Sequence, residues 1–161
     1  MIVAIDRSTA SKDVFETAVY LAKTTGASLM LLHVLSDQEN DDSSSSIDLK
    51  REGNPLDSSI LEAYDQHWQE LERQQQQRLK VMRSLVKEAT AAGVNAEFTQ
   101  TLGDRGETIC NLAQTWSADL IVVGSRGLTG IKEMFLGSVS NYVTHHAPCS
   151  VFIVLKTADT N

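Results

Sequence analysis

The stretch LIVVGSRGLTGIKEMFLGSVSNYV, residues 120–143, combines the patterns of a buried strand, a glycine-rich turn and a helix start. Residues 120–123 form a continuous apolar run rich in β-branched side chains, which is typical of a strand covered on both faces of a parallel sheet. The run stops at Gly124, Gly127 follows after two residues, and Gly137 follows after nine more. We therefore expect a strand that leads through a turn into a helix beginning near Gly137.

The same alternation of strand and helix patterns extends along the 161 residues. Apolar runs occupy residues 2–5, 28–35, 94–102, 120–123 and 151–155, and helical patterns occupy residues 11–25, 56–92, 106–116 and 137–146. Gly26 and Gly93 follow the first two helical patterns as stops. Strands separated by helices predict βαβ units, and therefore a single α/β domain with a parallel sheet between two helical layers.

The net charge of −7 is concentrated in one segment, because residues 37–73 hold 11 acidic and three basic side chains. The rest of the chain is nearly neutral, so we expect neither nucleic acid nor an anionic membrane surface as a partner. Two cysteines exclude a disulfide scaffold, no apolar run reaches membrane-spanning length, and no secretory leader is recognisable. These features predict a cytoplasmic protein.

Residues 36–54 are polar, acidic and serine-rich, and they predict a solvated loop. We expect residues 38–54 to be dispensable for folding, since they hold few apolar side chains and loop length costs little entropy. Replacing them with a short glycine-serine linker should shift the melting temperature, measured by circular dichroism, by only about a few degrees. Loss of soluble folded protein would show instead that the segment packs.

The glycines at 124, 127 and 137 admit two interpretations. Glycine at a strand end lets a ligand approach the backbone, and the helix N-terminus that follows suits a phosphate. Arg126 could then add a charged donor, and Ser138 and Ser140 could add hydroxyl donors. The alternative is a glycine-rich turn before a serine-capped helix, and spacing alone leaves both open.

Asp6 also admits two interpretations, whereas His33 is assigned to the core. Asp6 ends the first strand, where a carboxylate could accept hydrogen bonds from ribose hydroxyls or could be a turn or helix-capping acid. His33 lies inside an apolar strand and is interpreted as a core histidine with satisfied hydrogen bonds. Gly124, Gly127 and Gly130 form GxxGxxG, not the dinucleotide fingerprint, and GxxxxGK[ST], HExxH and paired CxxC motifs are absent. We assign no catalytic residue and no metal ligand.

Taken together, the motifs resemble those of the universal stress proteins. The pattern G-x2-G-x9-G-[ST] at residues 124–138 resembles the nucleotide-binding signature of that family. IVAID at residues 2–6, LMLLHVL at 29–35, SADLIVVGSRG at 117–127 and HHAPCSVFIV at 145–154 resemble its first, second, fourth and last strands with their flanks. The resemblance covers nearly the whole chain except residues 36–73.

The resemblance implies a five-stranded parallel sheet of order 3-2-1-4-5 in a domain spanning residues 1–156, followed by a tail at 157–161. It also implies membership of the ATP-binding subfamily, with ATP, ADP or AMP as ligand and Mg²⁺ or Mn²⁺ held by the phosphates. Ala4 and Asp6 would line the adenosine site, with Asp6 near the ribose, while Val34 and Val123 would lie by the adenine. The residues implied around ribose and phosphates are Gly124, Arg126, Gly127, Gly137, Ser138, Val139 and Ser140.

The sequence is compatible with three functions. The favoured one is a nucleotide-binding stress-response regulator that acts on an unidentified protein partner. The alternatives are a slow ATPase or phosphotransferase, and a scaffold that has kept the signature without binding. The resemblance further implies a homodimer paired through the last strand, and the uncharged run at residues 151–155 is an edge that invites such pairing. An edge covered by residues 156–161 is the alternative.

Overall fold

The computed structural model describes residues 1–6, 10–35, 58–125 and 136–155. The acidic loop expected at residues 36–54 and the expected tail at 157–161 lie outside the described residues. So do Arg126 and Gly127 of the glycine signature.

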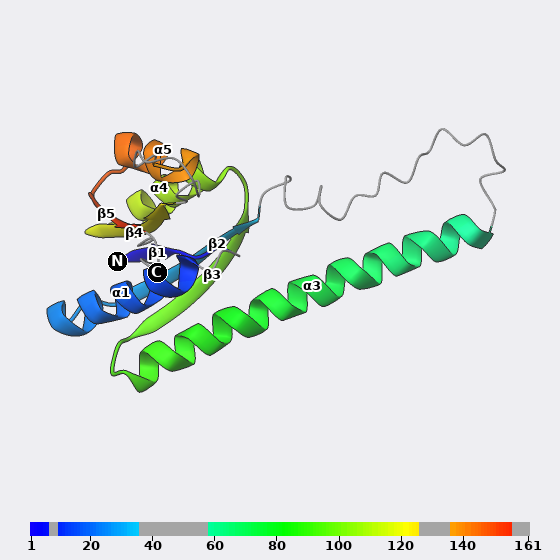
Figure 1. The fold of residues 1–161 in the computed structure, drawn as a ribbon, viewed down its shortest axis with the longest axis horizontal. Helices are drawn as coiled ribbons and strands as arrows, with labels where there is room; N and C mark the ends of the chain where they lie inside the picture. Colours follow the sequence, from blue (N-terminus) through cyan, green and yellow to red (C-terminus); the bar gives the residue numbers. More distant parts are fainter. Residues whose placement is uncertain (7–9, 36–57, 126–135, 156–161) are drawn as a thin grey trace, which may run out of the picture.

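A five-stranded parallel sheet forms the centre of the domain, with strand order β3-β2-β1-β4-β5 (Figure 1). The strands are β1 (Ile2–Ala4), β2 (Leu29–Leu35), β3 (Ala96–Leu102), β4 (Leu120–Ser125) and β5 (Ser150–Leu155). In the register of the sheet, Ile2 of β1 pairs with Met30 of β2 on one side and with Ile121 of β4 on the other. The predicted order and direction of the strands are confirmed.

Helices cover both faces of the sheet, as predicted (Figure 1). One face carries α1 (Ala10–Thr25) and α3 (Ser58–Ala91), and the other carries α4 (Arg105–Thr115) and α5 (Ser138–His146). The predicted stops of the first two helices are confirmed, because Gly26 and Gly93 have φ angles of 72° and 84°. These left-handed conformations suit glycine, which has no Cβ to clash with the backbone.

The packing of β2 explains why its residues are nearly all apolar. Leu29 and Leu31 pack toward Phe15 and Met82 on the α1 and α3 face, and the alternate residue Leu32 packs toward α4 and α5. Both faces of the strand are therefore buried, as expected for a parallel sheet between two helical layers. Each face has its own apolar core.

Helix α3 packs on the sheet only through its C-terminal part. Met82 and Ala89 are buried there, whereas the N-terminal part extends away from the sheet (Figure 1) and leaves Trp68 66% exposed. On this exposed part, a hydrogen bond from Arg73 lowers the pKa of Glu70 to about 2.

None of the described helices has both the length and the hydropathy of a membrane span.

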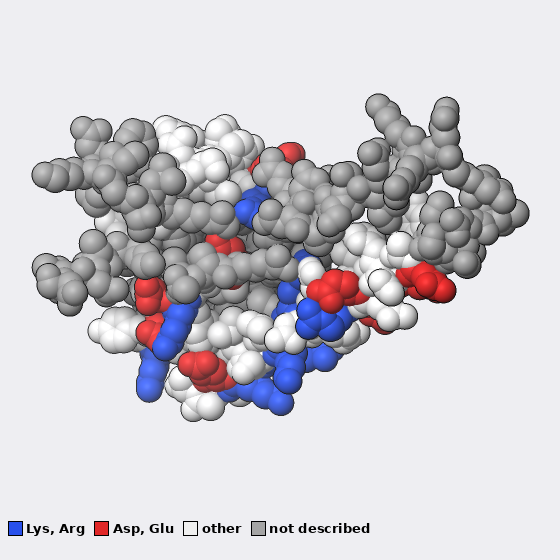
Figure 2. Space-filling view, turned by 45° about the vertical axis from the view of Figure 1, so that its right-hand side comes forward, with Lys and Arg blue, Asp and Glu red and all other residues white. Residues whose placement is uncertain are grey.

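On the face drawn in Figure 2, several Lys and Arg side chains lie close together in the lower middle, and Asp and Glu side chains lie on either side of them. Cys110 and Cys149 are free thiols, and burial raises the pKa of both. The described part of the chain therefore contains no disulfide.

Candidate nucleotide site

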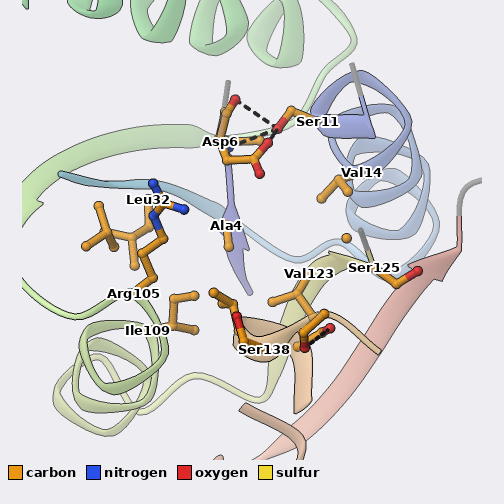
Figure 3. Close-up of a pocket in the computed structure, with 16 residues that line it drawn as sticks. Ala4, Asp6, Ser11, Val14, Leu32, Arg105, Ile109, Val123, Ser125 and Ser138 are labelled. Atoms are coloured by element: carbon orange, nitrogen blue, oxygen red, sulfur yellow. Dashed lines mark hydrogen bonds between the residues drawn. The ribbon is translucent and has the colours of Figure 1, made fainter. Parts of the chain in front are cut away.

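A pocket opens at the carboxyl edge of the sheet, beside the point between β1 and β4 where the strand order reverses (Figure 3). Open parallel sheets bind their ligands at this position, because neighbouring loops diverge there to opposite faces. The lining combines strand ends with helix starts. The residues are Ala4, Ile5, Asp6, Ser11, Val14, Leu32, Val34, Arg105, Ile109, Val123, Gly124, Ser125, Gly137, Ser138, Val139 and Ser140.

Most of the residues singled out from the sequence meet in this pocket. Those that line it are Ala4, Asp6, Val34, Val123, Gly124, Gly137, Ser138, Val139 and Ser140. The other two, Arg126 and Gly127, lie outside the described residues. One boundary differs from expectation, since β4 continues to Ser125 and Gly124 lies inside the strand instead of ending it.

One side of the pocket is apolar. Ala4, Leu32 and Val123 come from three neighbouring strands, and Ile109 reaches the same space from α4 (Figure 3). Leu32, Ile109 and Val123 are each at most 2% exposed. This surface can accept a flat apolar group such as a nucleobase.

Asp6 and Ser11 form the polar side of the pocket above β1 (Figure 3). The hydroxyl of Ser11 accepts a hydrogen bond from the Asp6 N–H at 2.9 Å and lies 2.6 Å from the Asp6 carboxylate oxygen Oδ1, to which it can donate. These contacts hold the carboxylate at the mouth of the pocket. Asp6 therefore combines local contacts to Ser11 of α1 with a place in the pocket lining.

The N-terminus of α5 is not capped by a side chain. Gly137 is its N-cap residue and makes no side-chain hydrogen bond, whereas the N-cap of α4, Asp104, accepts from the Glu107 N–H at 3.0 Å. The first N–H groups of a helix have no acceptor within the helix. At α5 these groups belong to Ser138, Val139 and Ser140, all of which line the pocket.

The two serines at this helix start differ in what their side chains can do. The Ser140 hydroxyl donates to the Gly137 carbonyl at 3.0 Å, and Ser140 is 1% exposed. In this structure the single proton of the Ser140 hydroxyl is therefore donated to that carbonyl, and the backbone N–H of Ser140 is the group left at the pocket. Ser138 is exposed at the first position of the helix, and its hydroxyl stays a predicted donor.

Sequence reasoning missed several lining residues, among them Ser11, Leu32, Arg105 and Ile109. Arg105 begins α4, and in Figure 3 its side chain lies beside Leu32. The sequence did contain a signal for Arg105, since this residue follows the end of a strand by three residues and therefore lies at the carboxyl edge of the sheet with the other lining residues.

No group of three or more His, Cys, Asp or Glu side chains in the described ranges is arranged to hold a metal ion.

The comparison with known families agrees with this geometry. The model of the universal stress protein family matches residues 1–154. The chain belongs to the universal stress protein family. Universal stress protein Sll1388 of Synechocystis is 34% identical over 96% of both chains. Universal stress protein YxiE of Bacillus subtilis is 36% identical over 96% of this chain and 97% of its own.

Solved structures share the fold. The hypothetical protein MJ0577 superposes with a TM-score of 0.71 at 19% identity, covering 98% of this chain and 96% of its own. An Arabidopsis thaliana family member with AMP bound gives 0.62 at 23% identity, covering 99% and 92%. A universal stress protein in complex with cAMP gives 0.61 at 22% identity, covering 96% and 94%. At these identities the likeness shows the fold alone.

Proposed function

We propose that this protein binds an adenine nucleotide in the carboxyl-edge pocket and acts as a nucleotide-dependent regulator of the stress response. One observation carries the proposal: the N-terminus of α5, which has no side-chain cap, faces the same pocket as Asp6 and the apolar surface around Val123. A helix N-terminus attracts phosphate through its N–H groups and its positive dipole end. The AMP and cAMP complexes of family members support the choice of an adenine nucleotide.

Each part of the nucleotide has a proposed partner. The adenine would lie against Ala4, Val34 and Val123, and the ribose hydroxyls would donate to Asp6. The phosphates would lie at the amides of residues 138–140, beside Gly124 and Gly137. In the sequence signature Arg126 and Gly127 complete this phosphate site. ATP is the proposed form, with Mg²⁺ or Mn²⁺ held by its phosphates.

Mass spectrometry of the purified protein tests the proposal first, because a tightly held nucleotide is expected to copurify. After removal of that nucleotide, calorimetry with AMP, ADP and ATP should show one site per chain. Absence of heat with all three ligands would contradict the proposal. Phosphate release from ATP, measured on the same sample, is expected to be slow or undetectable, and rapid turnover would establish an enzyme instead.

We further propose a homodimer formed through β5. This strand is the edge of the sheet next to β4, and its side chains Phe152 and Leu155 are 41% and 46% exposed. An exposed edge offers unpaired backbone groups to a second strand. A charge at Phe152 should disfavour this contact, because pairing would bring two copies of the charge close together.

Sedimentation equilibrium at about 10 µM, a concentration at which many specific complexes persist, is therefore expected to show a dimer. Phe152→Lys should shift the protein to a monomer. Tyr20→Lys, at a 70% exposed position of α1, is the matched control and should remain dimeric. A monomeric unmodified protein, or a dimeric Phe152→Lys variant, would argue against pairing at this edge.

A further inference from the structure

Helix α3 carries opposite charges in its two halves. Residues 58–72 hold four acidic side chains and neither Lys nor Arg, whereas residues 73–91 hold five basic side chains and one acidic side chain. We call residues 58–72 the acidic half of α3 and residues 73–91 its basic half. The two halves are therefore complementary to each other in charge.

Compensation of the helix dipole does not account for this separation. Acidic side chains at a helix start and basic side chains at its end are favourable, but the effect falls off within the first and last turns. In α3 the first turn has no acidic side chain and the last turn has no basic one. The charges lie further inside the helix, where they can act on a second molecule.

The acidic half also carries an apolar stripe. About 18 residues make five turns of an α-helix, so Tyr64 and Leu71 point in the same direction as Met82 and Ala89 of the basic half. Met82 and Ala89 are buried on the sheet, but the acidic half extends away from it (Figure 1) and leaves Trp68 66% exposed. The face that packs on the sheet in the basic half therefore continues, in the acidic half, as an apolar stripe beyond the described strands.

A surface that can receive this stripe lies beside the basic half. A cavity of about 560 Å³ lies between α1 and α3, and Val81 and Leu85 contribute apolar surface to it. Val81 is 49% exposed, so part of this surface is open to solvent. The basic side chains of the lining outnumber the acidic ones, which suits an apolar segment with negative charge. These charged residues are Lys12, Arg73, Arg78, Asp6 and Glu88.

We propose that two copies of this chain pair through α3 in antiparallel orientation, with the acidic half of each helix along the basic half of the other and Trp68 against the apolar surface around Val81. A two-fold axis near the junction of the halves repeats every contact, as in isologous dimers. The helix has 34 residues and is about 50 Å long, so the overlap extends over many turns. A parallel pair would bring like charges together, which is unfavourable.

This interface is separate from the one proposed at β5. Helix α3 contacts β3, and β3 and β5 are the opposite edges of the sheet. Exposed ion pairs each contribute little, so we expect the α3 pairing to be the weaker of the two and to form only above about 100 µM. A chain that uses both edges then forms assemblies larger than a dimer at high concentration.

Sedimentation equilibrium of the Phe152→Lys variant isolates the α3 pairing, because the β5 edge no longer contributes. This parent variant should be monomeric at about 10 µM and dimeric at about 300 µM in buffer of low salt. Raising NaCl from about 50 mM to about 500 mM should weaken the association at least about fivefold, because salt screens exposed charges.

Two charge-reversed variants of this parent test the antiparallel arrangement. The first, which makes the acidic half basic, carries Glu62→Lys, Asp65→Lys and Glu72→Lys. The second, which makes the basic half acidic, carries Lys80→Glu, Arg83→Glu and Lys87→Glu. All six positions are exposed, so both variants should keep the fold, which circular dichroism checks. Each alone should stay monomeric at about 300 µM, whereas an equimolar mixture should be dimeric, because antiparallel pairing restores opposite charges in both contacts.

Trp68→Ser, in the same parent, tests the apolar stripe. It should weaken the association at least about fivefold, because the exposed ring is then missing from the interface. Trp116→Ser is the matched control, since Trp116 is 44% exposed at the end of α4, and this variant should associate like its parent.

Four results would overturn the pairing. They are a monomeric parent at about 300 µM, a charge-reversed variant that associates by itself like the parent, a mixture of the two that stays monomeric, and a Trp68→Ser variant that associates like the parent. A monomeric parent is the result expected if a different protein or another segment of the same chain covers the stripe. If a charge-reversed variant does not fold, the salt dependence and the two serine variants decide. None of these measurements depends on nucleotide binding or on pairing at β5.

Discussion

Replacing Gly137 by valine is expected to weaken nucleotide binding by at least about tenfold, or about 1.4 kcal/mol, without unfolding the protein. Gly137 lines the pocket as the N-cap of α5, so the added methyl groups would lie where the phosphates approach. Its φ of −59° is accessible to any residue. The glycine is therefore required by the ligand in this proposal and not by a positive φ of the backbone.

Calorimetry with AMP and ATP measures the effect, and circular dichroism checks the fold. Asn141→Val is the matched control, because it places the same side chain at an exposed position of the same helix outside the pocket. Gly124→Val is a poorer test, since a Cβ there would lie 3.0 Å from Val14 Cγ2 and would disturb packing as well. Unchanged affinity in folded Gly137→Val would place the nucleotide elsewhere.

Asp6→Ala should also weaken binding, by about 1–3 kcal/mol or less, the range for a hydrogen bond to a charged group. The loss of the contacts between Ser11 and Asp6 contributes to this effect, so Ser11→Ala should be measured beside it.

Replacing Gly106 by alanine is expected to destabilise the fold by about 1–3 kcal/mol. Gly106 is the second residue of α4, and alanine is a better helix former than glycine, so propensity alone would favour the opposite sign. The reason is the contact between α4 and α5: a Cβ at position 106 would lie 2.6 Å from Cδ1 and 3.0 Å from Cβ of Tyr142. The Tyr142 ring is stacked on His146 at 4.1 Å, which limits its movement.

Urea unfolding gives the free energy of unfolding for this comparison. In a Tyr142→Ala background the ring contacts at 2.6 and 2.8 Å are absent and only the 3.0 Å contact with the Cβ of residue 142 remains, so Gly106→Ala should then be much less destabilising. The double-mutant cycle isolates that coupling. A stabilising Gly106→Ala in the unmodified background would show that the two helices separate without cost. Because Arg105 and Ser138 lie at the pocket ends of these helices, such separation would also alter the pocket.

Local sequence patterns were sufficient for much of the fold. Continuous apolar runs predicted β1, β2 and β4, because a strand buried on both faces needs apolar residues at successive positions. The weak alternation at residues 94–102 predicted β3, and the apolar run at 151–155 predicted β5, although both of these edge strands are only partly buried. Gly26 and Gly93 predicted the ends of two helices, because their backbone conformation excludes most other residues. The strand order came from the family resemblance, since the same alternation of strands and helices is compatible with several orders.

The residues that line the candidate site also fall into two groups, those that the sequence predicted and those that it did not. Asp6, Gly137 and Ser138 were predictable, because each stands beside a recognisable strand end or helix start. Arg105 and Ser11 were missed, because their places in the pocket depend on which loops meet at the carboxyl edge.

The sequence by itself determined the βαβ alternation, the buried strands and the start of α5 at the Gly137–Ser138 pair, since all of these depend on neighbours in the chain. Only the tertiary structure decided which polar atoms keep a partner. The Ser140 hydroxyl is satisfied by the Gly137 carbonyl, whereas His33 Nε2 is left without a partner in the described residues. It also decided that Gly106 must be small, because Tyr142 is 36 residues away in the chain. Hydrogen bonds and steric contacts depend on distance in space, and residues far apart in sequence approach one another only when the sheet and its two helical layers assemble.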